Sequence, residues 1–304
     1  MRRIAIQLLL LLTTLTWRPA LGADTAAIVL SEQGGAYAEV ADALRGELGA
    51  GAELVEVTPR NPDALLRTQA RIVVAVGTQV CRRLAESEVA VPMLCVLLPS
   101  AAFEHIAQSA PPKGKSITAL LLDQPASRQM ALLRLALPHR RDVAVLLGPD
   151  SSFMNSPLAA SAARHGLKLT SAQIRVPDEL SATLQRVLSD ADVLLAVPDS
   201  AVFNSGTTQN ILRTTFQRGV PLVAFSPAYV KAGALLALYT TPAQVGRQAG
   251  RTLRDFFAGR ALPRTQSPSE FEVSANRHVA RSLGIELEDE AVLTERLRKL
   301  EQKP

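Results

Sequence analysis

Five short polar segments, each directly after an apolar run, hold the residues best suited to binding chemistry. They are residues 31–35 (SEQGG), 77–79 (GTQ), 148–156 (GPDSSFMNS), 198–200 (PDS) and 226–227 (SP). Glycine lets a backbone approach a ligand closely, and helix N-terminal amides with Ser, Thr or Asn side chains can hold a carboxylate or another anion. Each segment alone could be an ordinary turn or helix cap. Together they favour a ligand-binding cleft, because open α/β sheets bind ligands beyond the carboxyl ends of their strands.

Local catalytic motifs are missing from the chain. No G-x-G-x-x-G follows a predicted strand, and the sequence has neither the phosphate-binding G-x-x-x-x-G-K-[ST] pattern nor the nucleophile elbow G-x-S-x-G. The histidines are dispersed, and none has a second histidine or a carboxylate at the spacing of four that a zinc helix needs; they are His105, His139, His165 and His278. We therefore expect a binding protein rather than an enzyme, with no metal and no cofactor.

The elements that must position the polar segments alternate between strands and helices. The predicted strands are residues 26–30, 53–57, 71–76, 92–98, 117–122, 142–147, 167–176, 193–197, 222–225, 234–239 and 270–273. The predicted helices are residues 37–48, 79–85, 126–137, 157–165, 178–188, 207–218, 243–258 and 277–283, with a short helix from Asn61 and a charged one from Asp289. The apolar runs are continuous rather than alternating, which indicates parallel sheets covered on both faces. Two successive βα series predict two doubly wound α/β lobes.

Composition and charge narrow the class of partner. The chain has 304 residues, of which 47% are apolar and 20% charged, so it can bury a sizeable core. Aromatic residues make up only 4%, which argues against a stacking platform for nucleic acid or carbohydrate. The formal net charge is +5, and loss of the three N-terminal arginines with a leader would reduce it to +2. We expect no nucleic-acid partner, and the sequence gives no sign of an oligomer, so a monomer is predicted.

Residues 1–22 have the pattern of a secretory signal peptide. Arg2 and Arg3 precede an apolar stretch, residues 4–15, that is too short to span a bilayer. Ala20 and Gly22 are the small residues that a signal peptidase needs at positions −3 and −1. Cleavage one residue later and an uncleaved anchor are the alternatives. We expect an exported, periplasmic protein that is not inserted in the membrane after cleavage.

Cys81 and Cys95 are the two cysteines, one on a predicted helix and one on the next predicted strand. Both are expected to face an apolar interior. A disulfide is compatible with an oxidising compartment. Two buried free thiols are the expectation that we favour, since the spacing matches no metal or redox motif.

Several sequence blocks together carry a resemblance to a known family. They are residues 117–138 (ITALLLDQPASRQMALLRLALP), 143–156 (VAVLLGPDSSFMNS), 191–200 (ADVLLAVPDS), 220–225 (VPLVAF), 230–237 (VKAGALLA), 245–249 (VGRQA) and 271–284 (FEVSANRHVARSLG). From about residue 24 to about residue 284, their order and spacing resemble the ABC-transporter substrate-binding family whose better-known members bind tryptophan or tyrosine. The resemblance implies a type I periplasmic-binding fold, whose two lobes close on a solute by a hinge motion and present it to a permease.

The resemblance also implies a division into lobes and a set of contacts. Residues 23–118 with 231–304 would form lobe I, and residues 119–230 lobe II. Asn155 and Ser156 match the family's second-lobe ligand loop, and Thr78 matches the threonine that holds a carboxylate. Asp199 matches the acidic residue that binds an amino group, while Ser200 replaces the usual asparagine. The other candidate contacts are Ser31, Gln33, Gly34, Ser152, Phe153 and Ser226.

Two departures from the family pattern bear on the solute. The family's Asp-Pro pair after the fourth first-lobe strand is replaced by residues 98–100 (LPS), and its tyrosine-bearing stretch before residue 245 by residues 240–242 (TTP). The predicted function is a periplasmic solute-binding protein of an ABC importer that takes an amino-acid-like or small aromatic solute. The alternative is a periplasmic sensor or interaction protein on the same fold that recruits an envelope partner. The charged tail, residues 286–303, could be its docking helix, although a solvated terminal helix is the interpretation that we favour.

Overall fold

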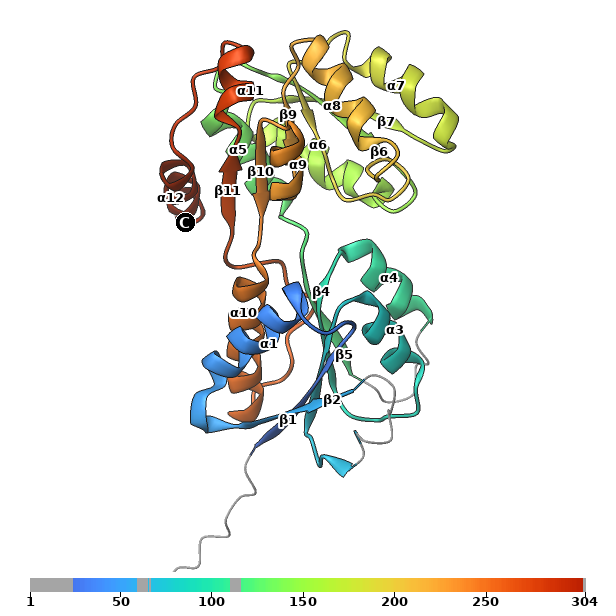
Figure 1. The fold of residues 1–304 in the computed structure, drawn as a ribbon, viewed down its shortest axis with the longest axis vertical. Helices are drawn as coiled ribbons and strands as arrows, with labels where there is room; N and C mark the ends of the chain where they lie inside the picture. The colour runs from blue at the N-terminus through green and yellow to red at the C-terminus, as the bar shows by residue number, and fades with distance from the viewer. Residues whose placement is uncertain (1–23, 59–64, 66, 110–115, 303–304) are drawn as a thin grey trace, which may run out of the picture.

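Apolar runs rich in β-branched residues form two separate sheets in the computed structural model, one in each of two lobes (Figure 1). The structure describes residues 24–58, 65, 67–109 and 116–302. The predicted signal peptide and the short helix predicted from Asn61 lie outside the described residues. No helix in the described ranges is long and apolar enough to cross a membrane.

The first lobe is a parallel sheet with helices on both faces. Its strand order is β2-β1-β3-β4-β5, and the strands are β1 (Thr25–Leu30), β2 (Glu53–Val57), β3 (Ile72–Val76), β4 (Met93–Leu98) and β5 (Ile117–Leu121). One face packs on α1 (Gly35–Leu48) and α10 (Pro242–Phe257), and the other on α3 (Thr78–Glu86) and α4 (Ser100–Ser109). Ile28 in β1 lies in the first of these cores and Val29 in the second, as the continuous apolar pattern predicts.

The second lobe is a six-stranded sheet of order β11-β10-β9-β8-β6-β7, parallel except for β11. Its strands are β6 (Asp142–Leu147), β7 (Lys168–Gln173), β8 (Val193–Leu195), β9 (Leu222–Ala224), β10 (Leu236–Tyr239) and β11 (Glu272–Ala275). The helices on one face are α5 (Ala126–Ala136), α6 (Asn155–Arg164), α11 (Arg277–Ser282) and α12 (Glu290–Glu301). The helices on the other are α7 (Leu180–Val187), α8 (Thr208–Gln217) and α9 (Pro227–Ala232). The short 3-10 helices are η1 (Gly49–Gly51), η2 (Ser152–Met154) and η3 (Pro177–Glu179).

The pairing of the last strands corrects the predicted division into lobes. Residues 231–304 were expected in lobe I, yet β10 pairs with β9 and β11 pairs with β10 in the second sheet. Of this C-terminal part, α10 packs on the first lobe against α1. The chain therefore crosses between the lobes three times within the described residues: after β5, between β10 and α10, and between α10 and β11.

The charged C-terminal helix is packed on the second lobe along one face. Leu293 and Leu297 of α12 are fully buried in the second-lobe core. Arg128 of α5 donates two hydrogen bonds, of 2.6 and 2.9 Å, to the Glu301 carboxylate. Its guanidinium lies 4.2 Å from the ring centroid of Phe271. The charged side chains of α12 lie on its other face, which is exposed to solvent.

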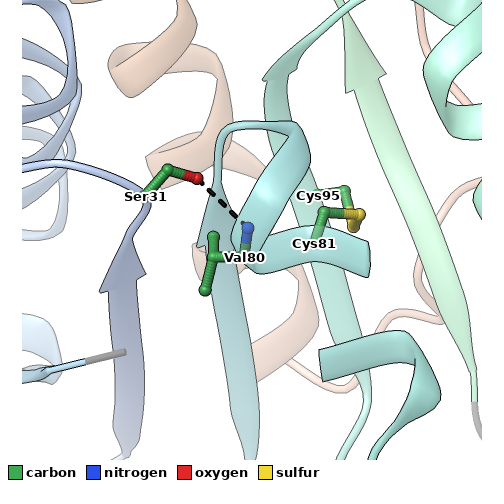
Figure 2. The surroundings of a disulfide bond; sticks show 4 residues. All are labelled: Ser31, Val80, Cys81 and Cys95. Atoms are coloured by element: carbon green, nitrogen blue, oxygen red, sulfur yellow. Dashed lines mark hydrogen bonds between the residues drawn. A yellow bond between two sulfur atoms is a disulfide. The ribbon is translucent and has the colours of Figure 1, made fainter. Parts of the chain in front are cut away.

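Cys81 and Cys95 form a disulfide, so the expectation of two free thiols is wrong (Figure 2). Both residues lie on the predicted elements, α3 and β4, and both are fully buried. Because α3 packs directly on this face of the sheet, the two side chains meet, with a Cα–Cα distance of 5.7 Å. Sequence spacing places each cysteine on its element but cannot show that the two face each other.

Two glycines let α10 lie unusually close to α1. A Cβ added at Gly246 would lie 2.4 Å from the carbonyl oxygen of Val40 and 2.7 Å from the Cβ of Ala43. One added at Gly250 would lie 2.6 Å from the Cβ of Glu47. The spacing of four puts both glycines on one face of α10. This contact fixes α10, and with it the two crossing segments that α10 joins, on the first lobe.

We expect Gly246→Ala to lower the free energy of unfolding by about 1–3 kcal/mol, because the new methyl group has no room beside the backbone of α1. Urea denaturation followed by circular dichroism measures the change. Gly46→Ala is the matched control: Gly46 is exposed on α1 with no heavy atom within 4 Å of the added Cβ. There alanine should stabilise by about 0.5–1 kcal/mol. Equal effects at both sites would contradict the close-contact account.

Replacing both cysteines by alanine should cost about 3 kcal/mol, because the bond closes a loop of about 15 residues and restricts the unfolded chain. The check is urea denaturation of the wild-type protein and the double variant without reductant. A thiol titration of the denatured wild-type protein should find no free thiol before reduction and two after it. Two free thiols before reduction would contradict the bond.

Candidate functional site

A cavity of about 610 Å³ lies between the two lobes, beside the crossing segments. We call it the hinge cavity. Its walls come from the carboxyl ends of β4, β5, β8, β9 and β10, as expected for ligand sites in open α/β sheets. The lining residues are Glu39, Leu97, Pro99, Leu122, Asp123, Gln124, Gln129, Leu132, Leu195, Ala196, Pro198, Val223, Ala224, Phe225, Ser226, Pro227, Leu238, Tyr239, Thr240, Thr241 and Pro242. Its volume is that of a small-molecule site.

A second cavity of about 530 Å³ adjoins the first. We call it the outer cavity. Pro99, Pro198 and Phe225 line both cavities. One wall of the outer cavity belongs to α3 and α4 of the first lobe, and the other to the loops after β6 and β8 of the second. The two cavities are therefore parts of one interlobe cleft.

Asp199, a predicted ligand contact, lines the outer cavity and holds two second-lobe loops together. Its Oδ2 accepts hydrogen bonds from the backbone N–H groups of Gly148 (3.0 Å) and Ser151 (2.9 Å) and from Ser151 Oγ (2.7 Å). Its Oδ1 accepts one from Ala201 N–H (3.0 Å). A Cβ at Gly148 would lie 2.3 Å from Asp199 Oδ1, so the loop after β6 needs glycine there. Through these four bonds, Asp199 fixes the loops after β6 and β8, which form one wall of the outer cavity.

The other predicted second-lobe residues fall into two groups. Ser200 lines the outer cavity and donates to Asp150 Oδ2 at 2.7 Å. Ser226 lines the hinge cavity and caps α9. The remaining four are exposed and line neither cavity; they lie on η2 and the start of α6: Ser152, Phe153, Asn155 and Ser156.

The predicted first-lobe residues gather at the carboxyl edge of the first sheet. Ser31 Oγ accepts a hydrogen bond of 3.2 Å from Val80 N–H, which ties the end of β1 to the first turn of α3, where Thr78 lies (Figure 2). A Cβ at Gly77 would lie 2.7 Å from Ser31 Oγ, so this junction also requires glycine. Gln33 and Gly34 are exposed. None of these residues lines either cavity, so their roles stay predictions.

Sequence reasoning missed the polar residues of the hinge cavity, among them Asp123, Gln124 and Gln129. Residues 123–125 follow a predicted strand, as the five selected segments do, so the same signal could have found the first two. Gln129 lies inside α5 on the core side, where a polar residue gives no local signal.

Two ionisable side chains of the hinge cavity, Asp123 and Tyr239, have raised pKa values. Asp123 Oδ2 accepts a hydrogen bond of 2.5 Å from Ser100 N–H. Burial raises the pKa of Asp123, although the hydrogen bonds from Ser100 oppose that shift. Burial and the negative charge of Glu272 raise the pKa of Tyr239 to about 12. The phenol therefore stays protonated and donates to Glu272 Oε2 at 3.2 Å.

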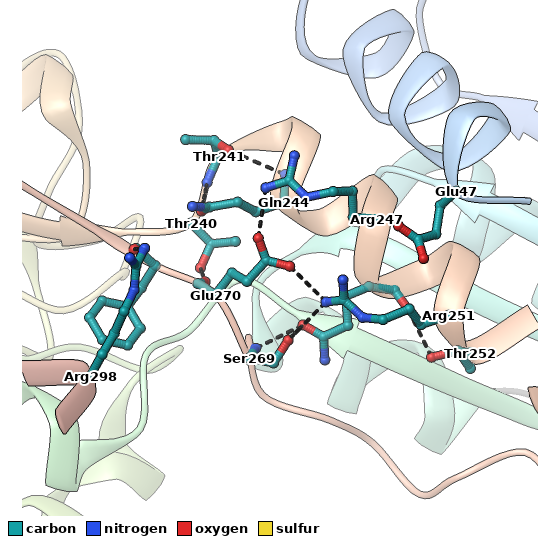
Figure 3. A network of polar contacts seen from close by, with 12 residues as sticks. Glu47, Thr240, Thr241, Gln244, Arg247, Arg251, Thr252, Ser269, Glu270 and Arg298 are labelled. Carbon is teal, nitrogen blue, oxygen red and sulfur yellow. Dashed lines mark hydrogen bonds and ion pairs between the residues drawn. The ribbon is translucent and has the colours of Figure 1, made fainter. Parts of the chain in front are cut away.

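Hydrogen bonds join the three crossing segments into one hinge network, and Figure 3 shows its part around Thr240, Glu270 and the arginines of α10. Thr240 Oγ1 accepts from Gln124 Nε2 and donates to the carbonyl oxygen of Glu270, both at 2.8 Å. The Glu270 carboxylate accepts from Arg247 (2.6 Å) and Arg251 (2.7 Å) of α10. Burial raises the pKa of Glu270, but the two arginines outweigh it and hold the pKa below its ordinary value.

Glu270→Gln should destabilise the protein by about 1 kcal/mol at pH 7, because it removes a partly exposed ion-pair network. A lowered native pKa gives stability that is fully present above the ordinary glutamate pKa and is lost as pH falls through the lowered value. The difference between the wild-type protein and the variant should therefore shrink on acidification.

Thermal melts between pH 7 and pH 3 measure this difference. Glu286→Gln is the control, because Glu286 is exposed in the structure. It should leave stability nearly unchanged at every pH. A Glu270→Gln effect that is independent of pH would contradict the ion-pair account.

Comparisons with known proteins address the family and the fold. The model of the family described as ABC transporter substrate binding protein matches residues 58–297. The chain matches no curated protein at a significant level. Its two-lobed fold is the type I periplasmic-binding-protein fold of the solved structures it resembles, which confirms the predicted fold class.

Three solved structures are similar over most of the chain. A ligand-free, open substrate binding protein with adhesive properties from Clostridium difficile is 14% identical and has a TM-score of 0.68, covering 88% of this chain and 97% of that chain. An ABC domain in complex with L-Trp from Streptococcus pneumoniae is 14% identical, with a TM-score of 0.60 and coverages of 90% and 98%. A conserved domain protein from Vibrio cholerae is 18% identical, with a TM-score of 0.59 and the same two coverages, 90% and 98%.

Proposed function

The chain belongs to the ABC transporter substrate binding protein family, and from this premise we propose that it binds a small solute in the interlobe cleft and delivers it to an ABC importer. The observation that supports the proposal most strongly is the shared lining of the cleft: α4 of the first lobe faces Asp199 and Ser200 of the second across the outer cavity. A solute seated there would touch both lobes at once.

The connections between the lobes support a hinge mechanism. Three chain segments cross between the lobes, and the hinge network ties these segments to one another. Rotation about them would bring the first-lobe edge at Thr78 toward the second-lobe loop at Asn155 and Ser156. Ligand-bound closure of this kind is a common conformational change in binding proteins. The proposed solute is amino-acid-like or a small aromatic compound, and the L-Trp complex of a structural relative is in line with that class.

We place the protein in the periplasm as a monomer that meets an ABC permease. The signal-peptide pattern of residues 1–22 supports export, and the Cys81–Cys95 disulfide is of the kind that persists in oxidising compartments. The alternative is a sensor or interaction protein on the same fold; if it docked a partner through its charged tail, it would use the solvated face of α12, because Leu293 and Leu297 are buried in its own lobe.

A thermal-shift screen tests solute binding. The protein is refolded to remove any carried-over ligand and screened against amino acids, small aromatics, nucleosides and short organic acids. A ligand at 100 times its Kd should stabilise by about 2.7 kcal/mol, which raises Tm by about 2–4 °C.

Two variants on α4 locate the bound solute. Ala102 lines the outer cavity, and Ala107 is exposed on the same helix away from both cavities. Ala102→Trp should abolish the ligand-induced shift and Ala107→Trp should keep it. If no compound in the library raised Tm, solute binding would be contradicted. If the two variants behaved alike, the outer cavity would be excluded as the binding place, and the hinge cavity of the same cleft would remain.

A further inference from the structure

The charged residues that line the hinge cavity are both acidic. Asp123 follows β5, and Glu39 lies on α1. None of the described residues that line this cavity is a lysine, an arginine or a histidine. The site therefore offers a ligand two negative charges and no positive one.

The Asp123 carboxylate has only neutral donors. Its hydrogen bonds come from Ser100 and from its own backbone. A carboxylate that is largely removed from water is costly unless a cation or further donors compensate it. Among the described residues, no cation contributes to its pKa shift. A cation that entered the cavity would supply the missing charge.

Gln129 gives a second observation that is independent of charge. Its side chain is 8% exposed and lines the same cavity. Nε2 donates to the carbonyl oxygen of Gln124 at 2.8 Å, and this bond fixes the orientation of the amide, because a flip would set two oxygens against each other. Oε1 is then buried without a hydrogen-bond partner among the described residues. An N–H donor from a ligand would satisfy it.

The rest of the wall suits an apolar body. Leu132, Leu195 and Leu238 are buried residues with atoms on the cavity surface. Phe225 also lines this cavity, and its ring packs against that of Tyr229 with the ring centroids 4.9 Å apart. Aromatic faces also attract cations.

We propose that the hinge cavity binds an apolar amine in its ammonium form, with N–H groups directed to Asp123 and Gln129 Oε1 and a hydrocarbon or aromatic body against the leucines and Phe225. The inference rests on the proposed function, but it replaces the amino-acid-like solute by an amine without the carboxylate. A ligand carboxylate would meet Glu39 and Asp123 with no cation to offset it. The backbone N–H of Ser100, at the start of α4, is already used by Asp123.

Isothermal titration calorimetry on the purified protein tests this class. The panel takes amines from butylamine to 2-phenylethylamine and tryptamine, each beside the acid, the alcohol and the α-amino acid with the same apolar body. We expect an amine to bind at least tenfold more tightly than its three matched analogues.

Two variants assign the contacts. Asp123→Asn keeps an acceptor for Ser100 N–H but removes the charge, and it should weaken amine binding roughly 10- to 100-fold while leaving alcohol binding nearly unchanged. Gln129→Met removes the unpaired acceptor and should also weaken amine binding. Asp255→Asn, on the surface of α10, is the matched control and should bind as the wild-type protein does. Circular dichroism and Tm confirm that each variant is folded.

The outcomes separate this inference from the proposed function. If an acid, alcohol or amino acid binds as tightly as its amine, or if Asp123→Asn binds amines like the wild-type protein, the amine inference is overturned and solute binding stands. If no panel member binds at millimolar concentration, the amine inference is again overturned. The proposed function is contradicted only if the broad thermal-shift screen also finds no compound that raises Tm.

Discussion

Thr240 joins the three segments that cross between the lobes, because its hydroxyl accepts a hydrogen bond from Gln124 and donates one to the carbonyl oxygen of Glu270. Each of these residues lies on a different crossing segment. The glycine face of α10 anchors two of the segments on the first lobe, and α5 carries the third into the second. The lobes therefore have separate cores but a common hinge. The hinge holds the two sheets apart, and the cleft is the space between them that the described chain leaves unfilled.

Three carboxylates near this hinge and cleft are satisfied in different ways. Asp199 has four N–H or O–H donors and holds the wall of the outer cavity in place. Glu270 is paired with two arginines and fixes the hinge. Asp123 has neutral donors and faces the hinge cavity. The first two have their partners within the protein, whereas the third is the one that a solute could complete. The same kind of side chain thus stabilises the fold where its partners are protein groups and is available for binding where it faces the cavity.

Much of the fold could be predicted from the sequence, because buried parallel strands have a strong local pattern. The predicted strands 53–57 and 142–147 coincide with β2 and β6. The lobe assignment of β10 and β11 failed because it depends on long-range pairing that the local pattern does not encode. The disulfide was missed for the same reason: the elements of Cys81 and Cys95 were right, but their contact depends on how α3 packs on the sheet. Of the predicted contacts, Asp199, Ser200 and Ser226 line the two cavities, whereas Gln129 was missed because it looks like any polar residue on a helix.

The central claim is that a solute binds between the lobes and draws them together. Spin labels at Glu104 of α4 and Ser205 of the second lobe, both exposed, report the distance across the cleft by pulsed electron resonance. The native cysteines are joined to each other, so the two introduced cysteines can be labelled selectively. The account predicts a shorter and narrower distance distribution when a solute that raises Tm is added at saturation. An unchanged distribution with such a solute bound would contradict closure around the cleft.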